Sequence, residues 1–304
     1  MRVVVTGGAG FIGAHSCRAV LEAGHAVTAL DDLSHGKREA LPPGADLVVM
    51  DVRSPQLADE FQRLRPDAVL HLAAQMDVRR SVADPMHDAS VNVLGTVNAL
   101  AAARRAGARR FVFASSGGAV YGEQEAFPAP EQHPRRPASP YGVSKLCGEE
   151  YLELARREGL SAISLRYANV YGPGQDPMGE AGVVAIFLHK MLSGGDPVIN
   201  GDGEQTRDFV SVEDVARANL LALGSQTTSP LNVGTGIETS VNQLARILAG
   251  AVGYTKPIRR GPPAAGEQRR SSIDPGEARG RLGWEPLVPL DEGLRRTADW
   301  FRSR

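Results

Sequence analysis

The sequence has little cysteine, no long apolar run and almost no net charge. Its 304 residues include two cysteines, Cys17 and Cys147, both within helical patterns. Two thiols suggest neither a disulfide framework nor a metal cluster, so we expect core thiols in a reducing compartment. No run approaches the ~20 apolar residues of a membrane helix, and the strand-like start "RVVVTGG" leaves no room for a leader. The formal net charge of -1 gives no basic field for nucleic acid or a membrane surface. We expect a cytoplasmic protein without nucleic acid, membrane or metal partners.

Short apolar runs alternate with amphipathic helical stretches through the first half of the chain. Almost every run lacks polar alternation, which is typical of strands that helices cover on both faces. The pattern therefore predicts an α/β fold with a doubly wound parallel sheet. The expected strands lie at 3–5, 26–30, 47–50, 68–72, 111–114 and 162–167.

The second half of the chain has a different organisation. After Tyr167 the alternation loosens into the loop "YGPGQDPMGEAG", which is followed by a helix near 182–192 and by mixed elements. We place a smaller C-terminal substrate lobe at 169–304, after a first domain at 1–168. The segment of about 208–233 resembles chain that returns to the first domain, so the boundary is expected to be interleaved.

The stretch "TGGAGFIG" follows the first expected strand and opens the first expected helix. Gly7, Gly10 and Gly13 recur at three-residue spacing. Glycine is needed where a turn is tight and where N–H groups approach a pyrophosphate at the positive end of a helix dipole. Asp31 ends the second strand, where a carboxylate accepts hydrogen bonds from ribose hydroxyls and repels a 2′-phosphate. The combination favours NAD over NADP.

Three more residues near this motif have two interpretations each. Lys37 and Arg38 keep NADP as an alternative, because their charges follow Asp31 closely. Asp51 follows the third strand. It is either a contact to the adenine amino group or a cap for the helix expected in "SPQLADEF".

The stretch "SPYGVSK" contains a tyrosine and a lysine four positions apart. With Ser139 as N-cap and Pro140 as first helical residue, Tyr141 and Lys145 lie one turn apart on one helix face. A free phenol has a pKa near ~10, so a base at neutral pH needs its phenolate stabilised by ~3 units, or roughly 4 kcal/mol. The Lys145 ammonium, an oxidised nicotinamide and the helix N-terminus are three positive sources for that stabilisation. We predict Tyr141 to be the base.

A serine from "ASSGG", just past the fifth strand, would complete the site by hydrogen-bonding the reacting oxygen. Spacing alone separates Ser115 poorly from Ser116, and Ser116 is predicted because it lies further into the loop. The plain alternative for Tyr141 and Lys145 is an exposed helix-surface pair. The dinucleotide motif ahead of them disfavours that alternative.

Seven segments together identify a resemblance: "TGGAGFIG", "HLAAQ", "SSGGAVYG", "PYGVSK", "LRYANVYGPGQ", "GDGEQTRDFVSVEDVA" and "GEQRRSSIDPGEARGRLGW". They resemble the extended short-chain dehydrogenase/reductase family, and within it the UDP-glucose 4-epimerases and related nucleotide-sugar epimerases. The likeness covers essentially the whole chain. It implies a Rossmann domain plus a nucleotide-sugar lobe, a tightly held NAD, a UDP-sugar substrate, and a homodimer formed through helices near 88–105 and 141–157.

The resemblance also implies a role for each matched residue. Tyr141 is the base, Lys145 orients it and the nicotinamide ribose, and Ser116 binds the sugar O4. Contacts to NAD are expected from Gly7, Gly10, Phe11, Ile12, Gly13, Asp31, Asp51, Val52, Leu72, Ala73, Ala74, Gln75, Asn92, Tyr141, Lys145 and Tyr167. Contacts to the nucleotide-sugar are expected from Ser116, Tyr141, Asn169, Val183, Arg207, Ser271 and Asp274, with Arg207 on the diphosphate.

Four of these substrate residues have a structural alternative. Asn169 is otherwise a turn residue, Val183 a core residue, Arg207 a surface charge and Asp274 a cap for the helix "PGEARGRL".

The implied reaction inverts C4 of the sugar through a transient 4-keto intermediate. A 4,6-dehydratase carries an Asp-Glu pair after its Ser/Thr as acid and base, whereas this chain has Gly117 and Gly118, which transfer no protons. The Glu that UDP-glucuronate decarboxylases normally carry in this loop is absent as well. The sequence therefore predicts an NAD-dependent epimerase interconverting UDP-glucose and UDP-galactose. A UDP-glucuronate 4-epimerase and a non-catalytic dinucleotide-sensing protein are the alternatives.

Two departures from the family pattern bear on the substrate. Ser271 aligns with the position that limits room at the sugar 2-substituent, and a serine there permits UDP-GlcNAc and UDP-GalNAc as further substrates. Many relatives have Arg-Pro-Gly-Glu where this chain reads "AAGE", so that Ala264 replaces a diphosphate arginine. Compensation is expected from Arg207, or from Arg259, Arg260, Arg269 or Arg270.

Overall fold

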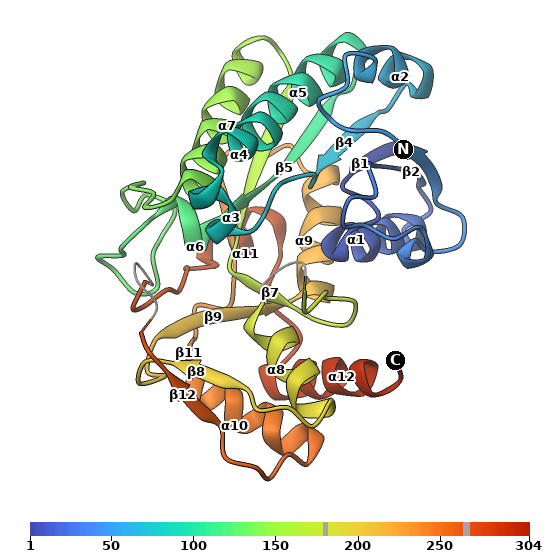
Figure 1. Cartoon of the computed structure of the whole chain (residues 1–304). Helices are drawn as coiled ribbons and strands as arrows, with labels where there is room; N and C mark the ends of the chain where they lie inside the picture. Colours follow the sequence, from blue (N-terminus) through green and yellow to red (C-terminus); the bar gives the residue numbers. More distant parts are fainter. Residues whose placement is uncertain (179–181, 264–267) are drawn as a thin grey trace.

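The computed structural model describes residues 1–178, 182–263 and 268–304, so Ala264 lies outside the described residues. Its largest element is a parallel sheet of seven strands in the order β10-β6-β5-β4-β1-β2-β3 (Figure 1). This confirms the predicted α/β fold with a doubly wound parallel sheet. The strands are β1 (Arg2–Thr6), β2 (Ala26–Asp31), β3 (Asp46–Val49), β4 (Ala68–His71), β5 (Arg110–Ser116), β6 (Ser161–Tyr167) and β10 (Leu231–Val233).

Helices cover both faces of this sheet, which explains why its strands are apolar throughout. On one face, Val3 and Val5 of β1 pack in a core with residues of α1 (Phe11–Glu22), α9 (Val212–Gly224) and α11 (Gly276–Leu282). On the other face, Val4 packs with residues of α2 (Leu57–Leu64), α5 (Gly95–Arg105) and α7 (Pro140–Arg157). Successive side chains of one strand therefore serve two cores.

A smaller lobe with its own core lies against the carboxyl ends of the large sheet, in the lower half of Figure 1. Its core joins Phe187, Phe209 and Leu244. One small sheet has the order β11-β9-β7 and another pairs β12 with β8. The elements are β7 (Asn169–Tyr171), α8 (Val183–Leu192), β8 (Val198–Asn200), β9 (Thr206–Ser211), β11 (Glu238–Ser240), α10 (Val241–Val252), β12 (Arg259–Gly261) and α12 (Leu290–Arg302).

The chain passes more than once between the part built on the large sheet and the smaller lobe. β9 belongs to the small sheet, whereas α9 packs on α1 and β10 pairs with β6 in the large sheet. The domain bounds of 1–168 and 169–304 stay a prediction. In the described ranges no helix is long and apolar enough to span a membrane. The remaining short elements are η1 (Arg38–Ala40), α3 (Val78–Ala83), α4 (Pro85–Ala89), the π-helical turn η2 (Ser90–Leu94) and α6 (Gly117–Val120).

The strand order reverses between β1 and β4. The chain leaves β1 toward β2 on one side of this point, and β4 continues toward β5 on the other. Diverging loops at such a point leave a crevice outside the carboxyl ends of the strands, where ligands bind in open α/β sheets. A ligand site is therefore expected at the carboxyl ends of β1, β2, β4 and β5.

Candidate active site

One cleft of about 1360 Å³ runs from this crevice to the smaller lobe. Gly7, Asp31, Ser116 and Tyr141 line it, together with Arg207 of β9 in the smaller lobe. A concave site of this kind at a strand-order reversal is where a ligand is expected. The cleft is long enough along the fold to bring the predicted cofactor motif and the predicted substrate residues into one space.

The glycine-rich turn after β1 leaves no space for side chains. Gly7 has φ +68°, and a Cβ there would lie 2.7 Å from the Ala73 nitrogen. A Cβ on Gly13 would lie 2.1 Å from the Gly7 oxygen, so this glycine lets α1 start directly against the turn. The helix begins after Gly10 with no side chain capping its N-terminus. Uncapped N–H groups at a helix N-terminus suit a pyrophosphate, so these residues fit the dinucleotide.

Asp31 ends β2 with its carboxylate held in place. Oδ2 accepts from the Ala9 N–H at 3.0 Å and Oδ1 from the Leu33 N–H at 2.9 Å. Burial raises the pKa of Asp31, and these two N–H groups lower it in part. Lys37 and Arg38 are not among the described residues that line the cleft. The carboxylate beside the cleft thus suits a ribose without a 2′-phosphate.

Asp51 binds its neighbour Arg53 and does not cap a helix. Arg53 Nη2 lies 2.5 Å from Asp51 Oδ2, and this hydrogen bond lowers the pKa of Asp51. α2 has Gln56 at its N-cap, so the capping interpretation of Asp51 is wrong. The adenine contact stays a prediction. The other predicted cofactor residues on this side line the cleft, namely Phe11, Ile12, Val52, Leu72, Ala73, Ala74 and Gln75.

Asn92 lies behind the cleft wall and is not among the described lining residues. Its Nδ2 donates to the Gln75 carbonyl at 2.8 Å, and its Oδ1 accepts from the Gln75 N–H at 2.9 Å. Both functional groups of the buried amide are used within the fold. Asn92 holds Gln75, which does line the cleft, and the direct cofactor contact of Asn92 stays a prediction.

The structure adds Asp88, which the sequence analysis missed. This carboxylate is fully buried and accepts from Asn92 Nδ2 at 2.9 Å, Gln75 Nε2 at 3.0 Å and Ser144 Oγ at 2.7 Å. It thus ties the wall of the cleft to α7. A lone acid in a short helix gives no pattern that predicts burial, so sequence offered no signal for it.

The helix that carries the predicted base begins as expected. Ser139 is the N-cap, and its side chain accepts from the Gly142 N–H at 3.1 Å. Tyr141 and Lys145 follow on one face and both line the cleft. Lys145 Nζ lies 5.7 Å from the centroid of the Tyr141 ring and donates to the Ala114 carbonyl at 2.9 Å. The end of β5 therefore fixes the ammonium beside the phenol.

Burial governs the electrostatics of this pair. It raises the pKa of Tyr141 above its ordinary value, and a hydrogen bond with the Ser116 side chain lowers it in part. Burial also lowers the pKa of Lys145 to about 8, against the charge of Asp88, which raises it. These side chains by themselves do not make the phenol a base at neutral pH. A further positive charge within the cleft is required.

The two serines at the end of β5 have different partners. Both line the cleft, and Ser116 hydrogen-bonds Tyr141. Ser115 Oγ donates to Glu149 Oε1 at 2.6 Å in the interior. Neighbouring residues of a strand point to opposite sides, which explains the separation. Of the two candidates left open by the sequence, Ser116 is the one beside the phenol.

The glycines after Ser116 differ in the space around them. A Cβ on Gly117 would lie 2.8 Å from Ile273 Cδ1, so a side chain at this position would require the Ile273 side chain to shift. A Cβ on Gly118 would lie 3.9 Å from Asn169 Oδ1 and 4.0 Å from Ser271 Oγ. Gly118, Asn169 and Ser271 therefore face one another across one part of the cleft.

At the substrate end, three predicted residues besides Ser271 line the cleft: Asn169, Val183 and Arg207. Tyr167 lines it as well, and its hydroxyl donates to Asn219 Oδ1 at 2.6 Å. Asp274 is not among the described lining residues. Its Oδ1 accepts from the Gly276 N–H at 2.9 Å, but the N-cap of α11 is Pro275 and has no side-chain cap. The substrate contact of Asp274 stays a prediction.

The arginines considered as replacements at position 264 are held elsewhere. Arg259 pairs with Asp196 at 2.6 Å, Arg270 with Glu238 at 2.5 Å, and Arg269 with Asp202 at 2.8 Å. Arg260 donates to the Asp202 carbonyl. Among these candidates within the described chain, Arg207 is the one that lines the cleft.

A second cation at this end, Lys190, was missed by the sequence analysis. Lys190 follows Val183 and Ile186 on α8 at helical spacing, and all three line the cleft. Once Val183 is assigned to the cleft, the spacing of seven and four residues predicts Lys190 on the same helix face.

The chain is similar to known proteins over its full length. The model of the NAD dependent epimerase/dehydratase family matches residues 3–234. A UDP-glucose 4-epimerase of Mycolicibacterium smegmatis is 46% identical over 311 residues, covering 100% of this chain and 99% of that protein. A crystal structure of a Thermotoga maritima UDP-glucose 4-epimerase with UDP-glucose has a TM-score of 0.96 and 46% identity, covering 100% and 99% of the two chains. A Thermus thermophilus UDP-glucose 4-epimerase in complex with NAD has a TM-score of 0.95 and 44% identity, covering 99% of each chain.

Proposed function

Because the chain belongs to the NAD-dependent epimerase/dehydratase family, we propose that it interconverts UDP-glucose and UDP-galactose by inverting C4 of the sugar. The family match and the relatives confirm three predictions made from the sequence: the family, NAD as cofactor, and an isomerase acting on a nucleotide-sugar at C4. The particular sugars are what we propose.

The single observation that carries the proposal is the position of Tyr141. Tyr141 lines the cleft, with its phenol hydrogen-bonded to Ser116 and beside Lys145. The glycine-rich turn after β1 and Arg207 of the smaller lobe line the same cleft. A phenol between a dinucleotide region and a substrate region suits proton exchange with a substrate hydroxyl.

The residues that would hold NAD are the turn at Gly7 to Gly13, Asp31 and the wall at Leu72 to Gln75. When bound, NAD supplies a reversible two-electron acceptor and the positive charge that the phenol lacks. Tyr141 then takes the proton of the C4 hydroxyl and returns it to the product, while Ser116 hydrogen-bonds the same oxygen. Lys145 keeps a positive charge near the phenol, fixed by the Ala114 carbonyl.

The residues after Ser116 favour epimerisation over the elimination of water from the 4-keto sugar. Elimination of water needs an acid and a base among these residues. Gly117 and Gly118 have neither. These two positions therefore offer no group that expels water from a 4-keto sugar, and reduction from the other face is the step that we propose. Arg207 and Lys190 bring positive charge to the diphosphate end, which anchors the nucleotide while the sugar turns.

We extend the proposal to UDP-GlcNAc and UDP-GalNAc. Gly118 and Ser271 are small residues that face each other across the cleft, and this leaves room for an N-acetyl group. Ser271→Tyr should abolish turnover of UDP-GlcNAc and keep turnover of UDP-glucose within about tenfold, because the phenol fills that room. A wild-type protein inert toward UDP-GlcNAc but active on UDP-glucose would contradict the extension.

Incubation of the purified protein with a panel of UDP-sugars, without added NAD, tests the proposal. The products are read by NMR and mass spectrometry. Equal mass with inverted C4 for UDP-glucose is expected. Loss of water would indicate a dehydratase and loss of carbon dioxide a decarboxylase. Turnover of UDP-glucuronate alone would support the alternative 4-epimerase, and no change in any sugar would favour a dinucleotide sensor.

Two further properties belong to the proposal. We propose a homodimer, because Leu94, Val143 and Leu154 leave apolar surface exposed on η2 and α7, which pack against each other. We also propose a cytoplasmic location, with which the free thiols of Cys17 and Cys147 are compatible.

A further inference from the structure

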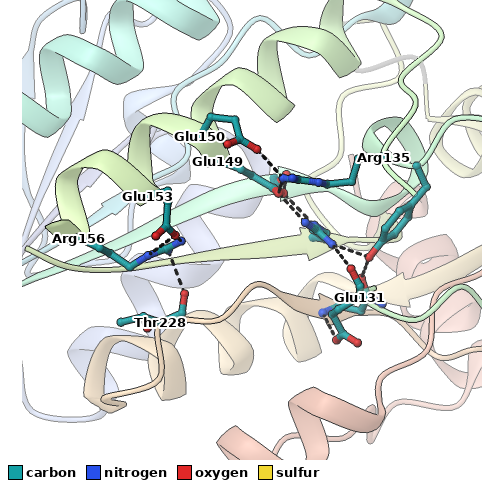
Figure 2. A network of polar contacts seen from close by, with 11 residues as sticks. Glu131, Arg135, Glu149, Glu150, Glu153, Arg156 and Thr228 are labelled. Atoms are coloured by element: carbon teal, nitrogen blue, oxygen red, sulfur yellow. Dashed lines mark hydrogen bonds and ion pairs between the residues drawn. The ribbon is translucent and has the colours of Figure 1, made fainter. Parts of the chain in front are cut away.

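A chain of buried polar contacts lies behind the cleft. It centres on an ion pair between Glu149 of α7 and Arg166 of β6, which are 4% and 2% exposed. Arg166 donates from Nε to Glu149 Oε1 at 2.9 Å and from Nη2 to Oε2 at 2.6 Å. Figure 2 shows the network from close by. Arg135 lies beside Glu149, and Glu131 lies below them in this view. Glu149 and Arg166 are not among the described residues that line the cleft.

This ion pair holds both ends of the loop that carries Ser116. At the start of the loop, Ser115 Oγ donates to Glu149 Oε1 at 2.6 Å. At its end, Arg166 Nη1 donates to the Tyr121 hydroxyl at 2.9 Å. Between these two contacts lie Ser116 and the turn α6. The position of Ser116 in the cleft therefore depends on the pair.

The same pair holds the helix of the base. Tyr141, Lys145 and Glu149 are spaced four residues apart on α7 and share one face. Two hydrogen bonds from a planar guanidinium to one carboxylate fix direction as well as distance. Glu149 bound to Arg166 thus sets the rotation of α7 relative to β6, and with it the direction in which Tyr141 projects.

The network continues to the wall that carries Ser271. The Tyr121 hydroxyl donates to Asn232 Oδ1 at 2.7 Å. Asn232 Nδ2 donates to the carbonyls of Asp274 at 3.1 Å and Ala129 at 3.0 Å. Asp274 lies three residues after Ser271. Burial raises the pKa of Tyr121 to about 12, so its hydroxyl keeps the proton that it donates.

Stability alone gives a weak reason for such a pair. Replacing a buried ion pair by well-packed apolar residues is often neutral or stabilising, because desolvation of both charges is costly. Glu149 and Arg166 instead hold the Ser116 loop and the Tyr141 helix directly, and they reach the Ser271 segment through Tyr121 and Asn232. Their remaining polar contacts are to Arg135 and to the Glu131 carbonyl. A fixed relation between the loop, the helix and the Ser271 segment is what proton transfer to one sugar oxygen requires.

We propose that Glu149, Arg166 and Tyr121 are positioning residues that hold Ser116, Tyr141 and the Ser271 segment in the geometry for proton transfer at C4. The inference rests on the proposed function. Since these residues do not line the cleft, their loss should act on the chemical step and leave the binding of substrate and cofactor.

Tyr121→Phe tests the proposal by removing one hydroxyl that joins Arg166 to Asn232. Tyr171→Phe is the matched control, because Tyr171 is equally buried and its hydroxyl has no hydrogen-bond partner within the described residues. We expect kcat for UDP-glucose to fall about 10-fold in Tyr121→Phe, with KM and NAD content within about twofold of wild type. Tyr171→Phe should keep wild-type kcat.

A second variant keeps the test decisive if Tyr121→Phe does not fold. Ser115→Ala removes the hydrogen bond between Glu149 and β5. Although Ser115 borders the cleft, its Oγ is directed to Glu149, so kcat should also fall about 10-fold with KM unchanged. Because both contacts act through one ion pair, the double variant should lose less than the product of the two single losses. All variants are compared at a temperature where circular dichroism shows them folded.

The outcomes separate this inference from the proposed function. An active wild type together with unchanged kcat in Ser115→Ala and in a folded Tyr121→Phe overturns the inference alone. Equal losses in Tyr121→Phe and Tyr171→Phe, or a double loss equal to the product of the singles, also overturn it. A folded wild type without epimerase activity overturns the proposed function and the inference with it.

Discussion

At two residues of the site, Tyr141 and Lys145, burial disfavours the protonation state that the proposed reaction needs. Burial raises the pKa of Tyr141, although the proposed reaction needs a phenolate. Burial lowers the pKa of Lys145 to about 8, although the reaction needs an ammonium. Both shifts follow from removing water from a charged group. The positive charge of bound NAD offsets the first shift and Asp88 opposes the second.

The lowered pKa of Lys145 predicts a pH dependence. As pH rises through about 8 the ammonium loses its proton, so kcat should fall on the alkaline side. The effect on stability has the opposite sign. The folded pKa lies below the unfolded value of 10.5, so the unfavourable contribution of this residue to folding is relieved as pH rises from about 8 toward 10.5.

Measuring kcat and the free energy of unfolding from about pH 6 to about pH 10 checks this prediction. Lys145→Arg is the control, since a guanidinium keeps its charge across this range. Its kcat should be lower but without the alkaline limb. An alkaline limb of the same midpoint in Lys145→Arg would contradict the assignment to Lys145.

The sequence predicted the residues with local signals and missed those without. The Ser139 cap, the helical spacing of Tyr141 and Lys145, and the glycine turn are short patterns, and the structure has each of these elements. Asp88 and Glu149 gave no such signal, because their burial depends on contacts with Ser144 and Arg166 that only the fold brings together.

Among the elements, the turn between β1 and α1 leaves no space for a side chain at Gly13. A Cβ added at Gly13 would lie 2.1 Å from the Gly7 oxygen. Gly13→Ala should therefore push α1 away from the turn, lower the free energy of unfolding by about 1–3 kcal/mol and reduce the NAD content of the purified protein. Thermal denaturation and the ultraviolet spectrum of released nucleotide measure both effects.

Gly250 of α10 provides the matched control for Gly13. No atom lies within 4 Å of a Cβ added at Gly250. Gly250→Ala should raise the free energy of unfolding by about 0.5–1 kcal/mol, because alanine loses less backbone entropy in a helix, and NAD content should stay unchanged. Similar losses in both variants would show that the space around Gly13 is not what matters.

At the scale of the whole molecule, the sequence predicted the large sheet better than the lobe. The expected strands at 3–5, 26–30 and 162–167 all fall within observed strands, because continuous apolar runs are clear signals. The lobe uses strands of three residues, such as β7 and β8, whose partners are distant in sequence. Such short segments have no periodicity of their own, so their pairing is decided by tertiary contacts.

The exposed apolar surface of η2 and α7 predicts the oligomeric state. Leu94 and Leu154 are 62% and 52% exposed. Replacing both by arginine should convert the proposed homodimer to a monomer in sedimentation velocity, because charges resist burial in an apolar interface. Leu287→Arg is the control at a similarly exposed leucine, and it should remain dimeric. A monomeric wild-type protein would contradict the dimer.

The account as a whole depends on the Tyr141 phenol, and one comparison tests it most directly. Two variants each remove a hydroxyl from α7. Tyr141→Phe removes it inside the cleft, and Tyr151→Phe removes it from the exposed side of the helix. Conversion of UDP-glucose to UDP-galactose is followed by NMR. We predict that kcat falls about 10³-fold in Tyr141→Phe and stays at the wild-type value in Tyr151→Phe. Wild-type kcat in a folded Tyr141→Phe protein would contradict the account.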